Sequence, residues 1–345
     1  MNDPIGIDVD KVSRWLSDNI DGATAPFAFD LLAGGHSNLT FRVVDANGSA
    51  YVLRRPPLGH LLASAHDMGR EYRIIAALGN TAVPVPAAHG HCDDIEVNGA
   101  PFYVMGLIDG LVIRTLDDAA HLLDAAGRRR AGEELVDTLA VLHDVDPDAV
   151  GLGGLGKKED YIARQLKRWH GQWEQSKTRE LPAVDDTFDI LVSRIPTQQG
   201  ASIVHGDYRL ENSMVSREGE LLAVIDWEIC TLGDPLADLG LLYVYWSIDN
   251  GDDEAALPQA PTLLDGFPSV DEVIARYAAR SSRDLSDLDY YIAFGYWKLA
   301  CIVEGVYNRY LSGARGERDP ATLVGFANQV ELCARLGAEF AGKLR

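Results

Sequence analysis

The spacing of hydrophobic and polar positions divides the chain into a first part rich in short strands and a second part rich in helices. Apolar residues recur at helical spacing over residues 9–20, which predicts an amphipathic opening helix. Short apolar segments separated by turn residues follow. They predict a strand, a glycine turn and a second strand over residues 29–44, and further strands at 50–54, near 89 and at 101–105. A helix over residues 71–78, ended by Gly79, interrupts these strands. The pattern predicts a small, mostly β lobe.

Helical periodicity takes over near Leu116 and continues to the end of the chain, apart from a β-rich insert that begins just after residue 200. A turn at Val97-Asn98-Gly99 is predicted to join the last two strands of the first lobe as a hairpin. The change of pattern places the boundary between lobes near residues 106–110. We therefore predict an α+β fold with a small β-rich lobe, residues 1–106, and a larger, mainly helical lobe, residues 107–345.

The charge of the chain limits its partners. The 345 residues include 31 basic and 52 acidic side chains, for a net charge of −21, whereas the 47% hydrophobic and 24% charged contents are ordinary for a globular protein. Nucleic acids and anionic membranes require a basic surface, so we predict neither as a partner. A well-solvated acidic surface and a preference for a cationic substrate are both compatible with this charge.

Several features predict a reducing, cytoplasmic environment. The four cysteines, at positions 92, 230, 301 and 333, are far apart and form no CxxC pair. Residues 1–20 lack a basic segment followed by an apolar run, so no secretory leader is expected. The longest apolar run, residues 239–248, is about half as long as a membrane span. We therefore predict a cytoplasmic protein without a membrane segment.

Two segments carry the residues that point to chemistry. The first reads His205-Gly206-Asp207 after an apolar pair and places Asn212 five positions beyond the aspartate. The second is a predicted strand that ends in Asp226. Phosphoryl-transfer sites combine one carboxylate that orients or deprotonates a hydroxyl group with a side-chain amide and a second carboxylate that hold Mg²⁺. The two segments therefore predict a site that transfers a phosphoryl group from a nucleoside triphosphate.

Each of these residues also has a plain structural interpretation. Asp207 could cap a turn through its side chain, and Asp226 could be an ordinary aspartate at the end of a strand. Glu228 follows Asp226 by two positions, so on an extended segment it would share a face with Asp226 and could approach the metal or the acceptor. The spacing of Asp207 and Asn212, with a second aspartate downstream, favours the chemical interpretation.

The motifs His-Gly-Asp-x-x-x-x-Asn, at residues 205–212, and Ile-Asp-Trp-Glu, at residues 225–228, resemble those of the aminoglycoside phosphotransferase and choline kinase-like superfamily. The resemblance extends over residues 31–310. This superfamily is related to the protein kinases, and the resemblance implies their bilobal fold, with ATP and Mg²⁺ as cofactors.

The same resemblance assigns roles to individual residues. It implies Asp207 as the catalytic base, which positions the acceptor hydroxyl and takes its proton late in the reaction. It implies Asn212 and Asp226 as the metal ligands. His205 and Asp238 are expected to be structural and to support the catalytic loop.

The nucleotide-binding half is marked first by a glycine-containing loop. Gly34, Gly35, Ser37 and Asn38 lie between two predicted strands and resemble the phosphate-covering loop of the superfamily. In such loops the missing Cβ atoms let backbone N–H groups approach phosphate oxygens. A plain hairpin turn is equally compatible with these residues.

Arg54 lies about twenty residues beyond this loop, where the protein kinases place a lysine that pairs with a glutamate of the next helix. The resemblance implies that Arg54 contacts phosphate with Glu71 as its partner, although a solvated Glu71 also fits the sequence. Alternation along the strand directs Arg55 to the other face. The planar fork of arginine grips phosphate in a different geometry from lysine. Met105 and Leu107, at the predicted hinge, are expected to lie at the adenine.

The sequence thus predicts an ATP- and Mg²⁺-dependent small-molecule kinase that phosphorylates a hydroxyl group, with an acceptor pocket built by helices over residues 243–340. The branch that the chain most resembles, through residues 52–57 and 205–212, also occurs fused to acyl-CoA dehydrogenases, which favours hydroxyacyl compounds as acceptors. Two alternatives stay open: an aminoglycoside-type antibiotic kinase, and a pseudokinase module that binds nucleotide without turnover. Residues 151–156 match a dinucleotide-binding pattern but follow a helix instead of a strand, so we interpret them as a connection.

Overall fold

The chain folds into two compact units in the computed structural model, which describes residues 4–32, 38–58, 67–249, 259–313 and 320–344. The smaller unit comprises Met1–Gly110, Val150–Leu152 and Leu222–Glu228, and the larger unit comprises the rest of the chain. An antiparallel sheet dominates the smaller unit and helices dominate the larger one. This confirms the predicted α+β class, with a small β-rich part and a larger helical part.

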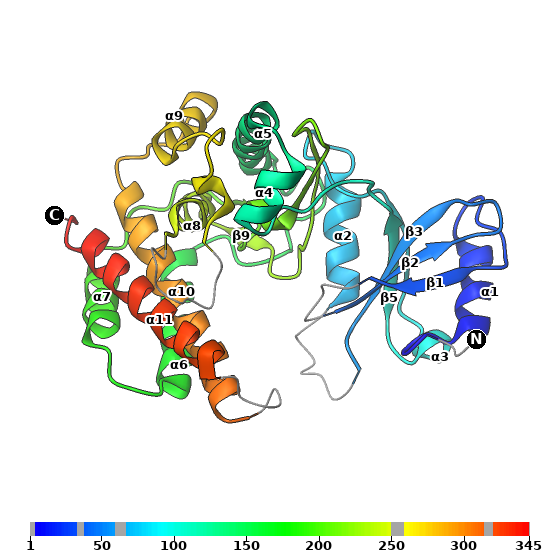
Figure 1. Cartoon of the computed structure of the whole chain (residues 1–345), viewed down its shortest axis with the longest axis horizontal. Helices are drawn as coiled ribbons and strands as arrows, with labels where there is room; N and C mark the ends of the chain where they lie inside the picture. The colour runs from blue at the N-terminus through cyan, green and yellow to red at the C-terminus, as the bar shows by residue number, and fades with distance from the viewer. Residues whose placement is uncertain (1–3, 33–37, 59–66, 250–258, 314–319, 345) are drawn as a thin grey trace. The chain divides into compact units, whose positions relative to one another are not determined.

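The sheet of the smaller unit has five antiparallel strands in the order β1-β2-β3-β5-β4. Figure 1 labels β1, β2, β3 and β5 of this sheet. The strands are β1 (Ala28–Leu31), β2 (Leu39–Val44), β3 (Ala50–Arg55), β4 (Ala88–Cys92) and β5 (Phe102–Gly106). Three helices accompany them: α1 (Val9–Asn19), α2 (Met68–Leu78) and α3 (Ile95–Asn98). The turn between β2 and β3 forms because the Asp45 carboxylate accepts the backbone N–H groups of Asn47 and Ser49, at 2.9 and 2.8 Å.

The two faces of this sheet differ because side chains alternate along each strand. One face is apolar and buries Phe41 and Leu53 in a core shared with α1, whose Leu16 is fully buried. The opposite face carries Arg54 and Tyr103, which are register partners on β3 and β5, and α2 packs against β4 and β5. The sheet therefore separates the apolar core of the unit from a face that carries charged groups.

The segment before β5 differs from its prediction. Residues 97–99, expected to be a hairpin turn, belong to the one-turn helix α3 and its end. Asp94 begins α3 by accepting the N–H of Glu96 at 2.9 Å, and Gly99 ends it with a left-handed φ of 70°. Helix α2 also begins three residues earlier than predicted, because Asp67 caps it by accepting the N–H of Arg70 at 2.9 Å. Both differences arise from side-chain caps.

The larger unit is built mostly from helices. They are α4 (Leu116–Leu122), α5 (Ala125–Asp144), α6 (Tyr161–Ser176), α7 (Pro182–Ser193), α8 (Leu236–Ser247), α9 (Val270–Arg280), α10 (Leu288–Leu311) and α11 (Pro320–Ala341), with 3-10 turns η1 (Leu210–Asn212) and η2 (Pro261–Leu263). The remaining strands of the chain are β6 (Ser202–Val204), β7 (Ser213–Val215), β8 (Leu221–Val224) and β9 (Thr231–Gly233), and β6 pairs with β9. No helix within the described ranges combines enough length and apolar character to cross a membrane.

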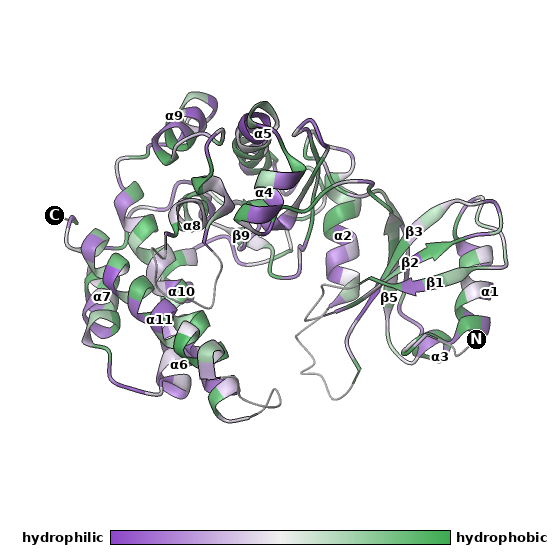
Figure 2. Ribbon diagram, viewed as in Figure 1, coloured by the Kyte–Doolittle hydropathy of each residue, from purple (hydrophilic) through white to green (hydrophobic). Residues whose placement is uncertain are grey.

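Helix α10 forms the centre of the larger unit. It packs against α6, α8 and α11, and most of its residues from Tyr290 to Gly305 are buried. A Cβ atom on Gly240 of α8 would lie 2.4 Å from the backbone oxygen of Tyr291, so only glycine permits the observed approach of the two helices. Helices nearer the surface, such as α5 and α9, show hydrophilic as well as hydrophobic residues in Figure 2, as expected for elements with one solvated face.

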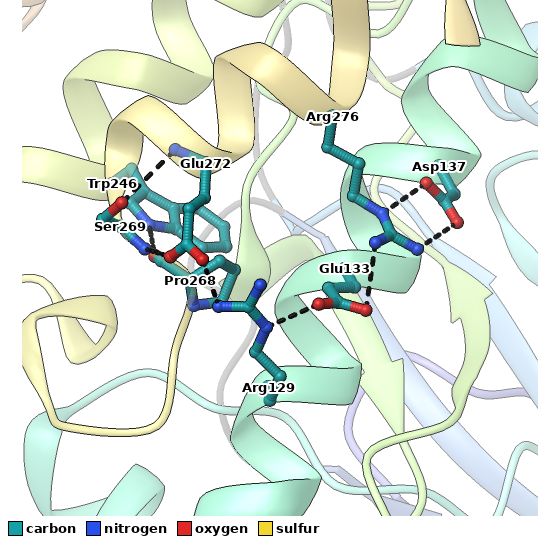
Figure 3. Close-up of polar contacts among 8 residues, drawn as sticks. All are labelled: Arg129, Glu133, Asp137, Trp246, Pro268, Ser269, Glu272 and Arg276. Carbon is teal, nitrogen blue, oxygen red and sulfur yellow. Dashed lines mark hydrogen bonds and ion pairs between the residues drawn. The ribbon is translucent and has the colours of Figure 1, made fainter. Parts of the chain in front are cut away.

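A network of charged side chains joins α5 to α9 (Figure 3). Arg276 of α9 donates both Nε and Nη2 to the carboxylate of Asp137, at 2.6 and 2.8 Å, and its Nη1 lies 3.0 Å from Glu133. Arg129 of α5 pairs with Glu133 and, at 2.8 Å, with Glu272 of α9. Bidentate arginine pairs within a network contribute more than isolated surface pairs, so this contact is expected to hold α9 in place.

The start of α9 is fixed independently of that network. Ser269 and Glu272 form a capping box, in which the Ser269 N–H donates to the Glu272 carboxylate at 2.8 Å and the Glu272 N–H donates back to the Ser269 hydroxyl at 3.3 Å. The indole N–H of Trp246 donates to the carbonyl of Pro268 at 2.9 Å (Figure 3). The helix therefore begins at a defined point beside α8.

We predict that Arg276→Ala lowers the free energy of unfolding by about 1–2 kcal/mol, because it removes the bidentate pair with Asp137 and the contact with Glu133 and leaves Asp137 only its pair with Arg280. The matched control is Arg335→Ala, which removes only an exposed i,i+4 pair with Glu339 on α11 and should leave the midpoint of thermal unfolding unchanged. Thermal unfolding of the two variants beside the wild type makes the comparison. Equal effects of the two substitutions would show that the α5–α9 network adds nothing.

Candidate functional site

The first sequence motif lies on a loop that follows β6 in the larger unit. Strand β6 ends at Val204, and Gly206 adopts a left-handed φ of 85°, which turns the chain sharply before Asp207. The 3-10 turn η1 then brings Asn212 back toward the aspartate. The loop is therefore folded so that Asp207 and Asn212, five positions apart, share one site.

The Asp207 carboxylate is held by several donors. The amide nitrogen of Asn212 donates to Asp207 Oδ2 and to the Asp207 backbone oxygen, both at 2.8 Å. The Nε atom of Arg209 lies 3.4 Å from the same Oδ2. Burial, together with a hydrogen bond to Asp207, raises the pKa of the Tyr245 hydroxyl well above its ordinary value, so Tyr245 stays protonated as a donor. These contacts fix the orientation of the candidate base.

Asp238 of α8 anchors the loop from below, as the resemblance implied. Its two carboxylate oxygens accept the backbone N–H groups of His205 and Gly206, at 2.7 and 2.9 Å. Burial alone opposes ionisation of Asp238, but the neighbouring His143 and the backbone donors hold the pKa of its carboxyl below the ordinary value. His143, whose Nε2 lies 3.6 Å from Asp238, has its own pKa lowered by burial. The loop is therefore anchored by a buried carboxylate that also contacts a buried imidazole.

Arg209 is oriented by an aromatic ring and a second carboxylate. Its guanidinium carbon lies 4.7 Å from the ring centroid of Tyr245, and its Nη1 lies 3.1 Å from Glu211. The position of Arg209, two residues beyond Asp207, brings a cation next to the candidate base. Arg209 thus places one positive charge between the carboxylates of Asp207 and Glu211 on this loop.

The second sequence motif lies in the smaller unit together with Arg54. The Arg54 guanidinium contacts Asp226 at 2.8 Å, Glu71 of α2 at 3.5 Å and Glu228 at 3.8 Å. The Tyr103 hydroxyl on β5 donates to Glu71 at 2.9 Å. The predicted pairing of Arg54 with Glu71 is thus present, and Glu71 is buried instead of solvated.

Asp226 has an unusual backbone conformation. It is one of two non-glycine residues with positive φ in the described chain, at 66°. The segment that carries it packs into the smaller unit, where the Val224 N–H donates to the carbonyl of Pro84 at 2.8 Å. Strained backbone is tolerated where surrounding structure holds it and is common at functional sites. The Asp226 side chain is 35% exposed, so it is open to a ligand while contacting Arg54.

Arg54 contacts three carboxylates, those of Glu71, Asp226 and Glu228, which we call the Arg54 cluster. These contacts shift the pKa values of its members. Burial raises the pKa of Glu71 to about 7, because Asp226 and Glu228 add to the effect of burial and Arg54 offsets only part of it. Burial alone would lower the pKa of Arg54. Glu71, Tyr103 and Asp226 outweigh that effect, so the pKa of the arginine is raised above its ordinary value. Among the described residues, the carboxylates of this cluster outnumber its one arginine.

The titration of Glu71 gives a testable dependence of stability on pH. Its folded-state pKa of about 7 lies above the ordinary value of 4.5, so folding binds a proton more tightly. The resulting stability is fully present below about pH 4.5 and is lost as the pH rises through about 7, by on the order of 3 kcal/mol. We therefore expect the stability of Glu71→Gln, relative to wild type, to improve as the pH rises from about 5 to about 8.

Urea unfolding of the metal-free protein at both pH values measures that difference. The control is Glu96→Gln, at an exposed position on α3. A constant difference between Glu71→Gln and wild type across this range would contradict the assignment of a raised pKa to Glu71.

The other predicted nucleotide contacts are only partly described. Gly34, Gly35 and Ser37 lie outside the described residues. Asn38 is buried, and its amide nitrogen lies 3.4 Å from Glu228, within the Arg54 cluster. Met105 pairs with Val52 across β5 and β3, and the half-buried Leu107 follows the end of β5. Their assignment to the adenine stays a prediction.

Four residues that contact either a predicted site residue or the first motif were not identified from the sequence: Tyr103, Arg209, Tyr245 and Lys298. Arg209 lies inside the first motif, so its nearness to Asp207 was available as a signal. The other three come from distant parts of the chain and meet the motifs only through tertiary packing. Tyr103 is a clear example, because nothing local reveals that β5 pairs with β3.

The chain is similar in sequence to a known enzyme family and to parts of longer proteins. The model of the phosphotransferase enzyme family matches residues 29–279, which is most of the chain. Acyl-CoA dehydrogenase family member 10 of Mus musculus is 33% identical over 333 residues, covering 93% of this chain and 30% of its own length. Acyl-CoA dehydrogenase family member 11 of Rattus norvegicus is 33% identical over 351 residues, covering 96% of this chain and 43% of its own length. The chain therefore spans less than half of these two relatives.

A solved structure is similar over its whole length. A Ralstonia eutropha protein, provisionally described as an aminoglycoside phosphotransferase, has a TM-score of 0.83 and 31% sequence identity, covering 98% of this chain and 99% of that one. This likeness confirms the predicted protein-kinase-like class of the fold.

Proposed function

Because the chain belongs to the phosphotransferase enzyme family, as its two motifs indicated, we propose that it transfers the γ-phosphoryl group of ATP to a hydroxyl group of a small molecule, with Mg²⁺ as the metal. What carries the proposal is the Asp207 carboxylate, held 2.8 Å from Asn212 on a loop anchored by Asp238. A general base must be fixed in this way to orient a hydroxyl group.

The residues of the two units take different parts in this reaction. Asp207 orients the acceptor hydroxyl and takes its proton as the bond to phosphorus forms. Arg54, braced by Glu71, binds phosphate oxygens of the nucleotide through its planar fork. Asn212 and Asp226 would hold Mg²⁺, which when bound would supply positive charge next to the phosphoryl oxygens. Asn38, whose amide nitrogen lies 3.4 Å from Glu228, supports the nucleotide-binding residues of the smaller unit.

The proposed metal ligands fit a hard cation. The Asn212 amide nitrogen is committed to Asp207, which fixes the amide and directs its oxygen, a suitable Mg²⁺ ligand, away from the base. Asp226 belongs to a cluster with three carboxylates and one arginine, so a cation there compensates excess negative charge. Asn212→Ala and Asp226→Ala should therefore lose Mg²⁺-dependent turnover while folding normally.

Hydroxyacyl compounds are the acceptor class that we favour. Support comes from the two relatives above, whose names refer to acyl-CoA dehydrogenases, while the chain covers only 30% and 43% of their lengths. An aminoglycoside kinase is the second candidate, favoured by the description of the Ralstonia protein. A nucleotide-binding pseudokinase is the third, but Asp207, Asn212 and Asp226 are all present, which disfavours it.

An acceptor screen coupled to ADP release separates the three candidates. The purified full chain is incubated with ATP and Mg²⁺ and with hydroxyacyl compounds, choline, ethanolamine or aminoglycosides. The proposal expects ADP release that depends on a hydroxyacyl compound and on Mg²⁺. Turnover with aminoglycosides alone would select the antibiotic kinase. Nucleotide binding, seen as a higher unfolding temperature, without turnover on any acceptor would select the pseudokinase.

A further inference from the structure

Lys298, in the middle of α10, is a buried cation outside both sequence motifs. Only 6% of the surface of Lys298 is exposed. Within the described residues, none of the ion pairs involves Lys298, so no carboxylate contacts its ammonium group directly. Buried lysines without a paired carboxylate are rare because the charge loses its hydration.

The ammonium group of Lys298 lies against the catalytic loop. Its Nζ donates to the backbone carbonyl oxygen of Gly206 at 3.0 Å, and this carbonyl belongs to the peptide bond that joins Gly206 to Asp207. On its other side Nζ lies 5.8 Å from the ring centroid of Trp169 on α6. Burial lowers the pKa of Lys298, while the charges of Asp207 and Asp238 oppose that shift.

Gly206 is therefore held at both of its backbone polar groups by side chains from different helices. Its N–H donates to Asp238 of α8 at 2.9 Å, and its carbonyl accepts from Lys298 of α10 at 3.0 Å. Hydrogen bonds to both polar groups of one residue restrict rotation of the peptide planes around it. Because Asp207 follows directly, its position depends on the second of these peptide planes.

We propose that Lys298 is a positioning residue for phosphoryl transfer, which fixes the peptide between Gly206 and Asp207 and so sets where the Asp207 carboxylate lies. The assignment rests on the proposed role of Asp207 as the base. Lys298 touches neither nucleotide nor acceptor in this proposal and acts through the loop. Displacement of a catalytic group by about 1 Å is enough to lower a rate about 100-fold, so loss of this contact should be visible in turnover.

The competing interpretation is that Lys298 only fills space in the core. A buried lysine in that role is replaceable by methionine, which matches its length and removes the cost of burying a charge. For Lys298→Met, a positioning role predicts a less ordered loop and slower catalysis, whereas a space-filling role predicts no change in either. Both interpretations predict similar stability.

Hydrogen exchange of the full chain tests the positioning role without an acceptor. We expect Lys298→Met to exchange the backbone amides of residues 205–207 at least about 10-fold faster than wild type, with an unchanged or higher unfolding temperature. Lys167→Met, at an exposed lysine of α6, is the matched control and should not change exchange there. Unchanged exchange at residues 205–207 in Lys298→Met overturns the proposal. If the methionine variant fails to fold, Lys298→Gln carries the same comparison.

Steady-state kinetics with the acceptor found by the screen gives the second test. Lys298→Met should lower kcat by about 10- to 100-fold and leave the KM values for ATP and acceptor within about twofold. Lys298→Arg keeps a cationic donor and should retain more of kcat than Lys298→Met. Equal losses in both variants, or an unchanged kcat in Lys298→Met, overturn the proposal. If the wild type transfers no phosphoryl group, the proposed function fails and hydrogen exchange still decides the role of Lys298.

Discussion

Replacing Asp207 with asparagine is expected to lower kcat about 1,000-fold or more while leaving the protein folded and able to bind nucleotide. The substitution keeps the size of the side chain but removes the carboxylate that takes the hydroxyl proton. Asp207 is held by Asn212 at 2.8 Å and approached by Arg209 at 3.4 Å, and the loop itself is anchored through the backbone of residues 205 and 206. The loop is thus expected to survive the change.

The rate of ADP release measures the loss of kcat. The unfolding temperature with and without Mg²⁺ and ATP measures whether the variant is folded and still binds nucleotide. Asp189→Asn, at an exposed position on α7, is the matched control for the substitution of an aspartate by its amide. An Asp207→Asn variant with more than about a tenth of the wild-type kcat would exclude Asp207 as the base. Loss of nucleotide binding in the same variant would instead show that Asp207 orders the site.

Asp238→Ala is expected to destabilise the larger unit by more than about 3 kcal/mol. Asp238 is 1% exposed and accepts two backbone N–H groups, and its removal leaves those buried donors of His205 and Gly206 without partners. The same change takes away the carboxylate beside the buried His143. Losing one member of a buried charged network is among the most destabilising substitutions that proteins show.

Chemical unfolding measures this loss, with Asp189→Ala as the control for removal of an aspartate from an exposed helical position. Asp238→Asn distinguishes charge from shape, because an amide has the same size but only one oxygen to accept the two N–H groups. We expect Asp238→Asn to be intermediate between wild type and Asp238→Ala. Full stability in the alanine variant would contradict the anchoring role of Asp238.

The strands of the smaller unit and the candidate residues of the two motifs were predictable because both depend on local patterns in the sequence. Alternation along residues 50–54 identified β3 and assigned Arg54 and Arg55 to opposite faces. The spacing from Asp207 to Asn212 marked both residues as candidates for one site, but their 2.8 Å contact was visible only in the structure. Helix α3 was missed because a single helical turn is too short to show a period and is defined by the cap at Asp94.

The supporting residues of the site were not predictable because they depend on tertiary contacts. Lys298 lies 92 positions from Gly206, and Tyr103 lies 32 positions from Glu71. Both reach the site through packing of elements whose pairing no local pattern reveals. The association of residues 222–228 with the smaller unit is a further example, since Asp226 meets Arg54 across 172 positions of sequence. Sequence motifs thus predicted which groups react, whereas the residues that support them became visible only in the fold.

Mass spectrometry of the acceptor after incubation with ATP and Mg²⁺ tests the central claim most directly. The account predicts that wild-type protein adds one phosphoryl group to a hydroxyl-bearing small molecule, with one ADP released for each, and that this product is missing when Mg²⁺ is chelated or when Asp207 is replaced with asparagine. ADP and inorganic phosphate without a phosphorylated acceptor, or equal product from wild type and Asp207→Asn, would contradict it.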